Sequence, residues 1–369
     1  MTAAPLAELT IDLGALAANY RLLSARSAPA RAGAAVKGNA YGTGMGEAAA
    51  TLFAAGCRDF FVATLAEAIA LRGTLPEGTI YVLCGPLEDD GPEYAAHRLT
   101  PVLNSLPQIA LWTRWCGAHG AAPAVLHLDT GMSRLGLAPA ELEALLSDPA
   151  SLLRFPVPLV MSHLASADEP ASRQSEAQLV QFRAALARLT PLLPNRPETS
   201  FANSAGIFLG PEYSFDLTRP GCALYGLTPT SHRPNPMRQV VELKARILQV
   251  RHIDAHQTVG YGAAHRATRA TRVATLGIGY ADGISRHLSH VGVAYVGGVR
   301  VPFIGRVSMD LITIDVGDVP EHLAAPGAWA EIMGPHHTPD DVAALAGTIG
   351  LEVLTSLGDR LPRRYIPAQ

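Results

Sequence analysis

Eight short apolar runs, separated by stretches of helical composition, limit the fold of this chain more than any other feature. Segments rich in Ala, Leu, Glu and Arg, such as 65–72, 138–146 and 172–189, lie between the runs. This alternation is typical of parallel strands joined by crossover helices, and eight such units predict an α/β fold, a (β/α)8 TIM barrel. The predicted strands are 33–37, 59–64, 79–83, 100–103, 124–129, 158–163, 199–203 and 215–218.

The character of the sequence changes at about residue 236. Closely spaced β-rich segments follow, with one short helix candidate at 340–347. We therefore predict a barrel domain over 1–235 and a mainly β domain over 236–369, joined by the proline-containing stretch 229–236. Residues 1–12 could instead supply a strand to the β domain. The predicted β segments of the second domain are 240–253, 271–276, 291–296, 299–304 and 311–316.

Composition excludes several classes of function. The 369 residues are 48% hydrophobic and 17% charged, with a net charge of -3, which suits a compact protein with a sizeable core. No basic tract indicates nucleic-acid binding, and no run of 18 apolar residues indicates a membrane span. Four cysteines without CxxC spacing indicate neither a disulfide framework nor a metal site. The N-terminal stretch lacks a signal-peptide pattern, so we expect a cytoplasmic protein that acts on a small molecule.

Lys37 is the strongest single candidate for chemistry. It ends the apolar run 34–36 and precedes the glycine-rich run 38–44. At the mouth of an apolar interior, desolvation lowers the pKa of a lysine and leaves an amine able to form a Schiff base, as pyridoxal phosphate (PLP) enzymes require. A lysine that merely extends to solvent from a strand end fits this stretch alone equally well.

Further polar residues follow the later predicted strands. The C-terminal ends of barrel strands form one face, on which TIM-barrel active sites are built. A lone histidine or arginine is usually structural, but several on one face predict a site. Ser204 and the amides after Gly221 also suit a phosphate group. The residues that join Lys37 on this face are Arg134, His163, Asn203, Ser204 and Arg219.

Several short motifs occur in one order along both predicted domains. They are AVKGNAYG at 35–42, DTGMSRLG at 129–136, ANS at 202–204 and RPG at 219–221, then VGYG at 259–262, GYADG at 279–283 and SMD at 308–310. This ordered series resembles the alanine racemase family, bacterial PLP enzymes in which a TIM barrel precedes a β domain. The resemblance runs nearly end to end.

The resemblance implies interconversion of L- and D-alanine by two bases, which supplies D-alanine for peptidoglycan. Lys37 would hold PLP and act as one base, and Tyr261 would be the opposite base, with His163 and Arg219 supporting it. A phenol with a pKa near 10 needs such cationic support. Arg219 would also face the pyridine nitrogen and discourage its protonation, which favours racemisation. The implied cofactor contacts are Lys37, Tyr41, Arg134, His163, Asn203, Ser204, Arg219, Gly221 and Cys222, and Arg134 and Met309 would bind the substrate carboxylate.

A homodimer with composite sites is also implied by the resemblance. The β domain of one subunit would close the barrel of the other, so that Tyr261 and Met309 act across the interface. Two-fold assemblies are also the commonest symmetric oligomers. The implied gate residues are Tyr280, Arg306, Leu351 and Asp168.

Four positions depart from the family pattern. Gly38 and Thr43 replace the usual alanine and histidine in the loop after the cofactor lysine. His127 replaces a lysine, often carbamylated, that orients the arginine matching Arg134. Leu351 replaces a tyrosine that contacts the phosphate and narrows the entrance, which removes a hydrogen bond of about 1 kcal/mol and could admit serine or other small amino acids.

Two other functional classes fit part of the pattern. A non-catalytic PLP carrier has the lysine and phosphate loop but lacks a second domain carrying a residue such as Tyr261. A barrel-type PLP decarboxylase has a β domain but generally places a carboxylate opposite the pyridine nitrogen, where this chain has Arg219. Visible absorbance separates PLP proteins from others, and CO2 release separates a decarboxylase from a racemase.

Overall fold

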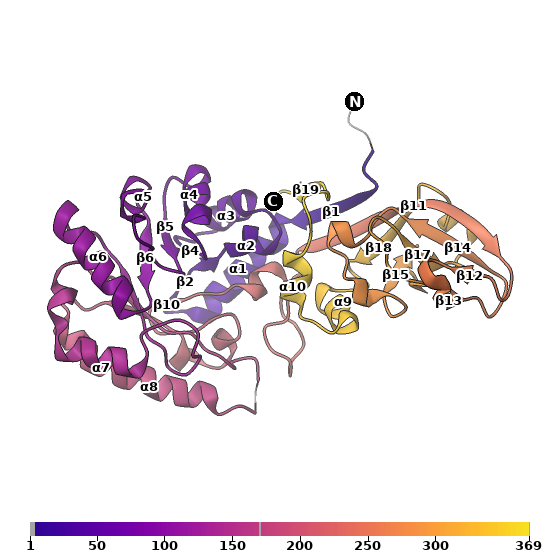
Figure 1. The fold of residues 1–369 in the computed structure, drawn as a ribbon. Helices are drawn as coiled ribbons and strands as arrows, with labels where there is room; N and C mark the ends of the chain where they lie inside the picture. Colours follow the sequence, from indigo (N-terminus) through magenta and orange to yellow (C-terminus); the bar gives the residue numbers. More distant parts are fainter. Residues whose placement is uncertain (1–3, 170, 369) are drawn as a thin grey trace.

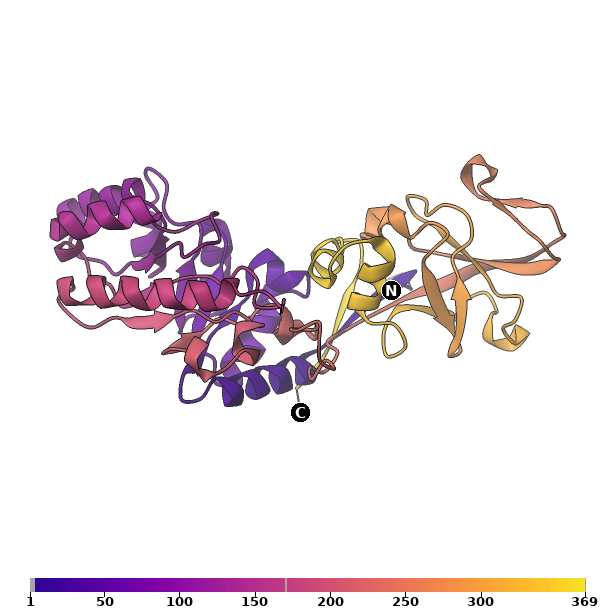
Figure 2. The ribbon, with the colours of Figure 1, turned by 90° about the horizontal axis from the view of Figure 1, so that it is seen from below.

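The computed structural model describes residues 4–169 and 171–368 and has two parts. Figures 1 and 2 show an elongated molecule with a barrel of strands and helices at one end and a mainly β part at the other. Helices α9 (Pro339–Ala346) and α10 (Gly350–Thr355) lie between them. Within the described ranges, no helix is both long and apolar enough to cross a bilayer.

Nine parallel strands form a nearly closed barrel in the first part, in the order β2-β10-β9-β8-β7-β6-β5-β4-β3. Strands β2 and β3 stand at the two ends of this order, and only Gly33 separates them in the chain. Together they act as one interrupted strand that closes the ring. A side chain at Gly33 would lie 2.8 Å from the carbonyl of Asp59, which explains the glycine. The eight-unit barrel prediction is confirmed. The strands are β2 (Arg31–Ala32), β3 (Ala34–Ala35), β4 (Asp59–Val62), β5 (Thr79–Val82), β6 (Thr100–Leu103), β7 (Val125–His127), β8 (Leu159–Met161), β9 (Glu198–Ser200) and β10 (Leu217–Thr218).

Barrel strands are covered on both faces, so they appear in the sequence as continuous apolar runs. All four residues of β4 are buried, for example. The observed strands end one to three residues earlier than predicted at several C-terminal ends, because the chain leaves the hydrogen-bonded ladder there to form the loops of the barrel mouth.

Three of the barrel helices begin after a residue whose side chain accepts an N–H group of the first turn, namely Asp12, Thr64 and Ser105. The hydroxyl of Thr64 accepts the Glu67 N–H at 3.3 Å, and the Glu67 carboxylate accepts the Thr64 N–H. These two hydrogen bonds form a capping box. The helices of the barrel part are α1 (Leu13–Ser27), α2 (Lys37–Tyr41), α3 (Met45–Ala54), α4 (Leu65–Thr74), α5 (Gly91–Ala96), α6 (Leu106–His119), α7 (Pro139–Ser147) and α8 (Gln174–Leu189).

The second part contains an eight-stranded, mostly antiparallel sheet and a two-stranded hairpin. Strand β1 belongs to this sheet: it pairs antiparallel with β11 and parallel with β19, with Leu9 opposite both Leu243 and Arg363. The strands of this part are β1 (Ala7–Asp12), β11 (Val241–Ile253), β12 (Thr258–Val259), β13 (His265–Arg266), β14 (Thr271–Leu276), β15 (Val293–Val296), β16 (Val299–Pro302), β17 (Ile312–Asp315), β18 (Trp329–Met333) and β19 (Arg363–Ile366).

Candidate active site

Lys37 lies two residues after β3, at the start of a left-handed turn. The backbone φ angles are 62° at Gly38, 54° at Asn39 and Ala40, and 55° at Tyr41. A residue other than glycine in this conformation costs roughly 1–2 kcal/mol, so the turn persists only because its surroundings hold it. Strain of this kind is commonest at functional sites.

The amine of Lys37 is partly buried at the barrel mouth. Burial lowers the pKa of Lys37, and the positive charge of Arg134 lowers it further, whereas Cys84 and Glu67 oppose this shift. A larger fraction of the amine is therefore neutral and nucleophilic near pH 7 than for an ordinary lysine. A cavity of about 450 Å³ beside Lys37 is also lined by Tyr41 and by Leu351 and Thr355 of α10.

Arg219 is buried in the same mouth, directly after β10. Its guanidinium donates to the Ser200 hydroxyl, to the Ser162 carbonyl at 2.6 Å and to Nδ1 of His163 at 3.4 Å. Burial lowers the pKa of Arg219 to about 10, so it stays charged at neutral pH. The pKa of His163 lies well below its ordinary value because of burial and then the charge of Arg219, so His163 is neutral. Because Arg219 donates to Nδ1, the proton of this imidazole lies on Nε2.

His127 ends β7 and faces the same cluster. Its Nδ1 lies 2.8 Å from Oδ1 of Asn104, and the Asn104 amide nitrogen donates to the carbonyls of Leu83 and Val102, both at 3.0 Å. The Asn104 oxygen must therefore accept from Nδ1, which leaves Nε2 of His127 as an acceptor. Burial and then Arg219 lower the pKa of His127 to about 3.

The predicted phosphate-binding residues lie in the loops after β9 and β10. The Ser204 hydroxyl accepts the N–H groups of Gly221 at 2.8 Å and Ala223 at 3.2 Å. The buried ring of Tyr41 stacks on Tyr225 with centroids 4.7 Å apart. A side-chain carbon at Gly221 would come within 2.4 Å of the Tyr41 hydroxyl oxygen, so the glycine allows the Tyr41 hydroxyl to lie against the backbone here.

Of the predicted residues of the β part, Leu351 lines the Lys37 cavity, whereas Tyr261 and Arg306 lie away from Lys37 of the same chain. Tyr261 follows β12, and Figures 1 and 2 place the β12–β13 hairpin at the end of the molecule opposite the barrel. Its side chain is 73% exposed. Tyr261 and Arg306 line one cavity of about 900 Å³ that no barrel residue lines. One chain therefore does not bring Lys37 and Tyr261 together.

Met309 and Tyr280 lie side by side in two loops of the β part. The Tyr280 N–H donates to the Ser308 carbonyl at 3.0 Å and the Ala281 N–H donates to the Met309 carbonyl at 2.9 Å. Arg360 joins the loops by binding Asp282 at 3.1 Å and Asp310 at 2.7 Å. The side chains of Tyr280 and Met309 are exposed.

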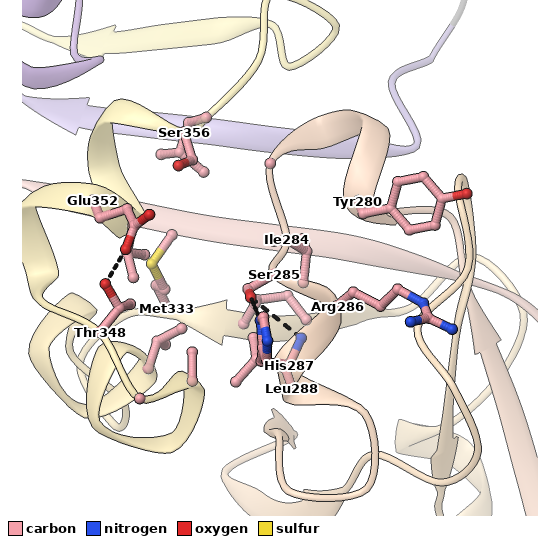
Figure 3. Close-up of a pocket in the computed structure, with 17 residues that line it drawn as sticks. Tyr280, Ile284, Ser285, Arg286, His287, Leu288, Met333, Thr348, Glu352 and Ser356 are labelled. Atoms are coloured by element: carbon pink, nitrogen blue, oxygen red, sulfur yellow. Dashed lines mark hydrogen bonds between the residues drawn. The ribbon is translucent and has the colours of Figure 1, made fainter. Parts of the chain in front are cut away.

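A separate cavity of about 790 Å³ has Tyr280 on its wall (Figure 3). Thr348 and Glu352 lie on one side of it, and Ser285, Arg286 and His287 lie on the other. Lys37 does not line this cavity.

Three predicted site residues bind the protein itself. Oδ1 of Asn203 accepts the Gly206 N–H at 2.9 Å, so its side chain closes a turn. Asp168 is exposed, and its backbone carbonyl accepts the Ser231 hydroxyl at 3.2 Å. The Cys222 thiol has a pKa raised by burial, which keeps it protonated.

Comparison with known proteins identifies the family. Residues 11–229 match the model of the alanine racemase N-terminal domain, and residues 240–365 match the model of the C-terminal domain. The chain belongs to the alanine racemase family. Alanine racemase of Rhodospirillum rubrum is 49% identical over 97% of this chain and 95% of its own length, and that of Methylobacterium nodulans is 48% identical over 98% and 96%.

Solved alanine racemase structures have the same fold. The Bartonella henselae enzyme, with covalently bound pyridoxal phosphate, is 40% identical with a TM-score of 0.94, covering 98% of this chain and 100% of its own. The enzyme from the D-cycloserine producer Streptomyces lavendulae is 32% identical with a TM-score of 0.94, covering 99% and 98%.

Residues of this alanine racemase family member that the motifs did not reveal hold the predicted ones in place. Tyr225 stacks on Tyr41, Asn104 sets the tautomer of His127, and Glu67 accepts the Gly38 N–H at 2.6 Å. Only Glu67 has a sequence signal, since Thr64 three residues earlier forms a capping-box pattern with it. The other contacts join residues distant in sequence.

Proposed function

We propose that this protein is a PLP-dependent alanine racemase that interconverts L- and D-alanine, with Lys37 and Tyr261 as the two bases. The observation that carries the proposal is the lowered pKa of the Lys37 amine in a barrel mouth that also contains the buried, charged Arg219. A nucleophilic amine is what Schiff-base formation requires, and a permanent cation is what we expect opposite the pyridine nitrogen.

The residues of the barrel mouth fit PLP. The Ser204 hydroxyl, the N–H groups of Gly221 and Ala223 that it accepts, and the Tyr41 hydroxyl, which lies against Gly221, come together in the mouth and suit the phosphate. Lys37 would hold the cofactor covalently, and Arg219 would face the pyridine nitrogen. When bound, PLP withdraws electrons from the substrate Cα and so makes its proton removable.

Each remaining group has a task set by its chemistry. The Lys37 amine would take or return a proton on one side of Cα, and the Tyr261 oxygen would do so on the other side. Arg134 and the Met309 N–H would hold the substrate carboxylate, since both are donors. Asn203 and Cys222 complete the proposed cofactor loop.

We propose a head-to-tail homodimer because Tyr261 follows β12, which lies at the end of the β part away from the barrel, whereas Lys37 lies at the barrel mouth of the same chain. The cavity that contains Tyr261 and Arg306 would then face the barrel of the partner subunit. Tyr280, Arg306, Asp168 and Leu351 would form the entrance. Leu351, which lines the Lys37 cavity, lacks a hydroxyl, so we expect alanine first and serine as a secondary substrate.

The biological role follows from this chemistry. We propose that the protein acts in the cytoplasm and supplies D-alanine for peptidoglycan. Decarboxylation is disfavoured because the group that we expect to face the pyridine nitrogen is Arg219 and not a carboxylate.

The test is optical rotation of L-alanine, D-alanine and L-serine solutions with purified protein and PLP. We expect racemisation of alanine from both directions and slower turnover of serine. Tyr261→Phe should reduce abstraction of the L-alanine proton by about 10²- to 10⁴-fold while the protein still binds PLP. Binding of PLP without racemisation would identify a carrier, and release of CO2 would identify a decarboxylase.

A further inference from the structure

Glu67 is an acidic residue at the barrel mouth to which no motif gives a role. It lies at the third position of α4, and both of its carboxylate oxygens accept backbone N–H groups. Oε1 accepts from Gly38 at 2.6 Å, and Oε2 accepts from Ala63 at 2.8 Å and from Thr64 at 3.3 Å. The carboxylate thus ties the residue directly after Lys37 to the end of the neighbouring strand.

The turn that Glu67 binds is strained and needs outside support. Residues 38–42 all have positive φ angles. On the side away from Glu67, the turn is held by the C-terminal segment: Arg363 donates to the Gly42 carbonyl at 3.1 Å, and the Tyr365 hydroxyl donates to the Thr43 carbonyl at 3.1 Å. These bonds hold the end of the turn, and Glu67 holds its beginning.

Glu67 also lies in the cavity of Lys37. Its negative charge raises the pKa of Lys37, in opposition to burial and Arg134, and Cys84 acts in the same direction as Glu67. The α10 residues that line this cavity, Leu351 and Thr355, carry no charge. Among the groups that shift the pKa of Lys37, Glu67 is therefore the one with a carboxylate.

We propose that Glu67 is a positioning residue for Lys37: it fixes the backbone that directs the amine and supplies the nearby negative charge that balances Arg134. This inference rests on the proposed function of Lys37 and adds the residue that controls its placement. It predicts that removing the charge affects Lys37 even in protein without cofactor.

Glu141 provides a matched control. It is also the third residue of a barrel helix, and its two oxygens accept the N–H groups of Leu106 at 3.0 Å and Ala138 at 3.1 Å. It does not line the Lys37 cavity. Glu67→Gln and Glu141→Gln remove the same charge from the same type of capping position.

The first measurement is the pH dependence of Lys37 acylation by acetic anhydride in the cofactor-free, full-length chain, read by peptide mass spectrometry. Glu67→Gln should move the midpoint for Lys37 to lower pH, and Glu141→Gln should leave it unchanged. An unchanged midpoint in Glu67→Gln would overturn the proposed charge effect. This readout does not depend on racemase activity, so failure of the proposed function would be seen separately, as absent turnover in the unmodified protein.

The second measurement is steady-state kinetics of the PLP-loaded variants. Misplacement of the amine should lower kcat by about tenfold to a hundredfold in Glu67→Gln, with a smaller change in KM. Glu67→Asp retains the charge but is too short to keep both sets of bonds, so it should retain the acylation midpoint and lose kcat. Equal kcat values for Glu67→Gln, Glu67→Asp and Glu141→Gln would overturn the positioning role.

Discussion

The side-chain oxygen of Asn104 accepts a hydrogen bond from Nδ1 of His127, so the proton of this imidazole lies on Nδ1. Burial lowers the pKa of His127, so the ring carries a single proton and is neutral. A histidine that stays neutral in the folded protein charges more readily once the chain unfolds. Between pH 6.5, the ordinary value, and about 3, the unfolded chain therefore binds more protons at His127 than the folded chain does. The free energy of unfolding falls with decreasing pH in this window by up to about 1.4 kcal/mol per pH unit for this group.

Replacing His127 with Gln should make acid unfolding less steep. The variant loses stability at pH 7, because Asn104 loses a well-placed partner, but its free energy of unfolding should fall less between pH 6.5 and 4. Urea unfolding at a series of pH values measures both effects. His232→Gln, at an exposed loop position, is the control; an unchanged pH slope in His127→Gln would contradict the neutral assignment.

Gly221→Ala should weaken PLP binding without preventing folding. The added carbon would lie 2.4 Å from the Tyr41 oxygen and must push that ring from its stack on Tyr225. Overpacking of this kind costs about 1–3 kcal/mol, so the Kd for PLP should rise by about fivefold to a hundredfold. Titration by visible absorbance measures it. Gly117→Ala in α6, where the added carbon meets open space, should bind PLP normally.

At the scale of elements, polar side chains near the start of the crossover helices bind the loops that follow barrel strands. Glu67 binds the loop after β3, Gln108 donates to the Cys84 carbonyl at 2.9 Å after β5, and Gln178 donates to the His163 carbonyl at 2.8 Å after β8. The helices thus hold the loops that carry the candidate site residues. A change at one of these capping positions should disturb one loop and not the whole barrel.

The sequence predicts the elements far better than these cross-contacts. Alternation reveals the eight barrel units because most of the strands are short apolar runs between helical segments, and strand 271–276 is predicted with its observed bounds. Strands β18 and β19 are missed: β19 reads Arg-Arg-Tyr-Ile, and it becomes a strand only because it pairs with β1 at the far end of the chain. The left-handed turn after Lys37 is likewise set by contacts with α10 and β19.

At the N-terminal face of the barrel, where β2 and β3 close the ring, we expect a buried carboxylate to contribute more to stability than an exposed ion pair. Asp59 is buried and accepts the Tyr81 hydroxyl at 3.1 Å, whereas Arg31 and Glu198, which bind each other, are about half exposed. Asp59→Ala should destabilise the protein by about 1–3 kcal/mol because Tyr81 keeps no partner. Glu198→Gln, which removes only the exposed partner of Arg31, should cost about 1 kcal/mol or less. Urea midpoints compare them, and the reverse order would contradict this account.

At the scale of the whole molecule, the proposed site draws on two chains. Lys37→Ala and Tyr261→Phe should each be nearly inactive alone. When the two variants are co-expressed, random pairing gives mixed dimers with one intact site each, so about a quarter of all sites should be active. Racemisation per subunit in the unfractionated mixture measures this, and after co-purification with two different affinity tags, which retains only the mixed dimers, half of the sites should be active. Absence of recovery in verified mixed dimers would contradict the composite site.

The pairing of β1 with both β11 and β19 has a consequence for synthesis of the chain. The ribosome makes β1 first, yet its partners lie more than 220 residues later, and the residues that brace the turn beside Lys37 come later still. At about 5–20 residues per second, β1 remains an unpaired edge for about ten seconds or longer. The barrel can assemble during translation, but loading of the cofactor must wait until residue 365 has left the exit tunnel.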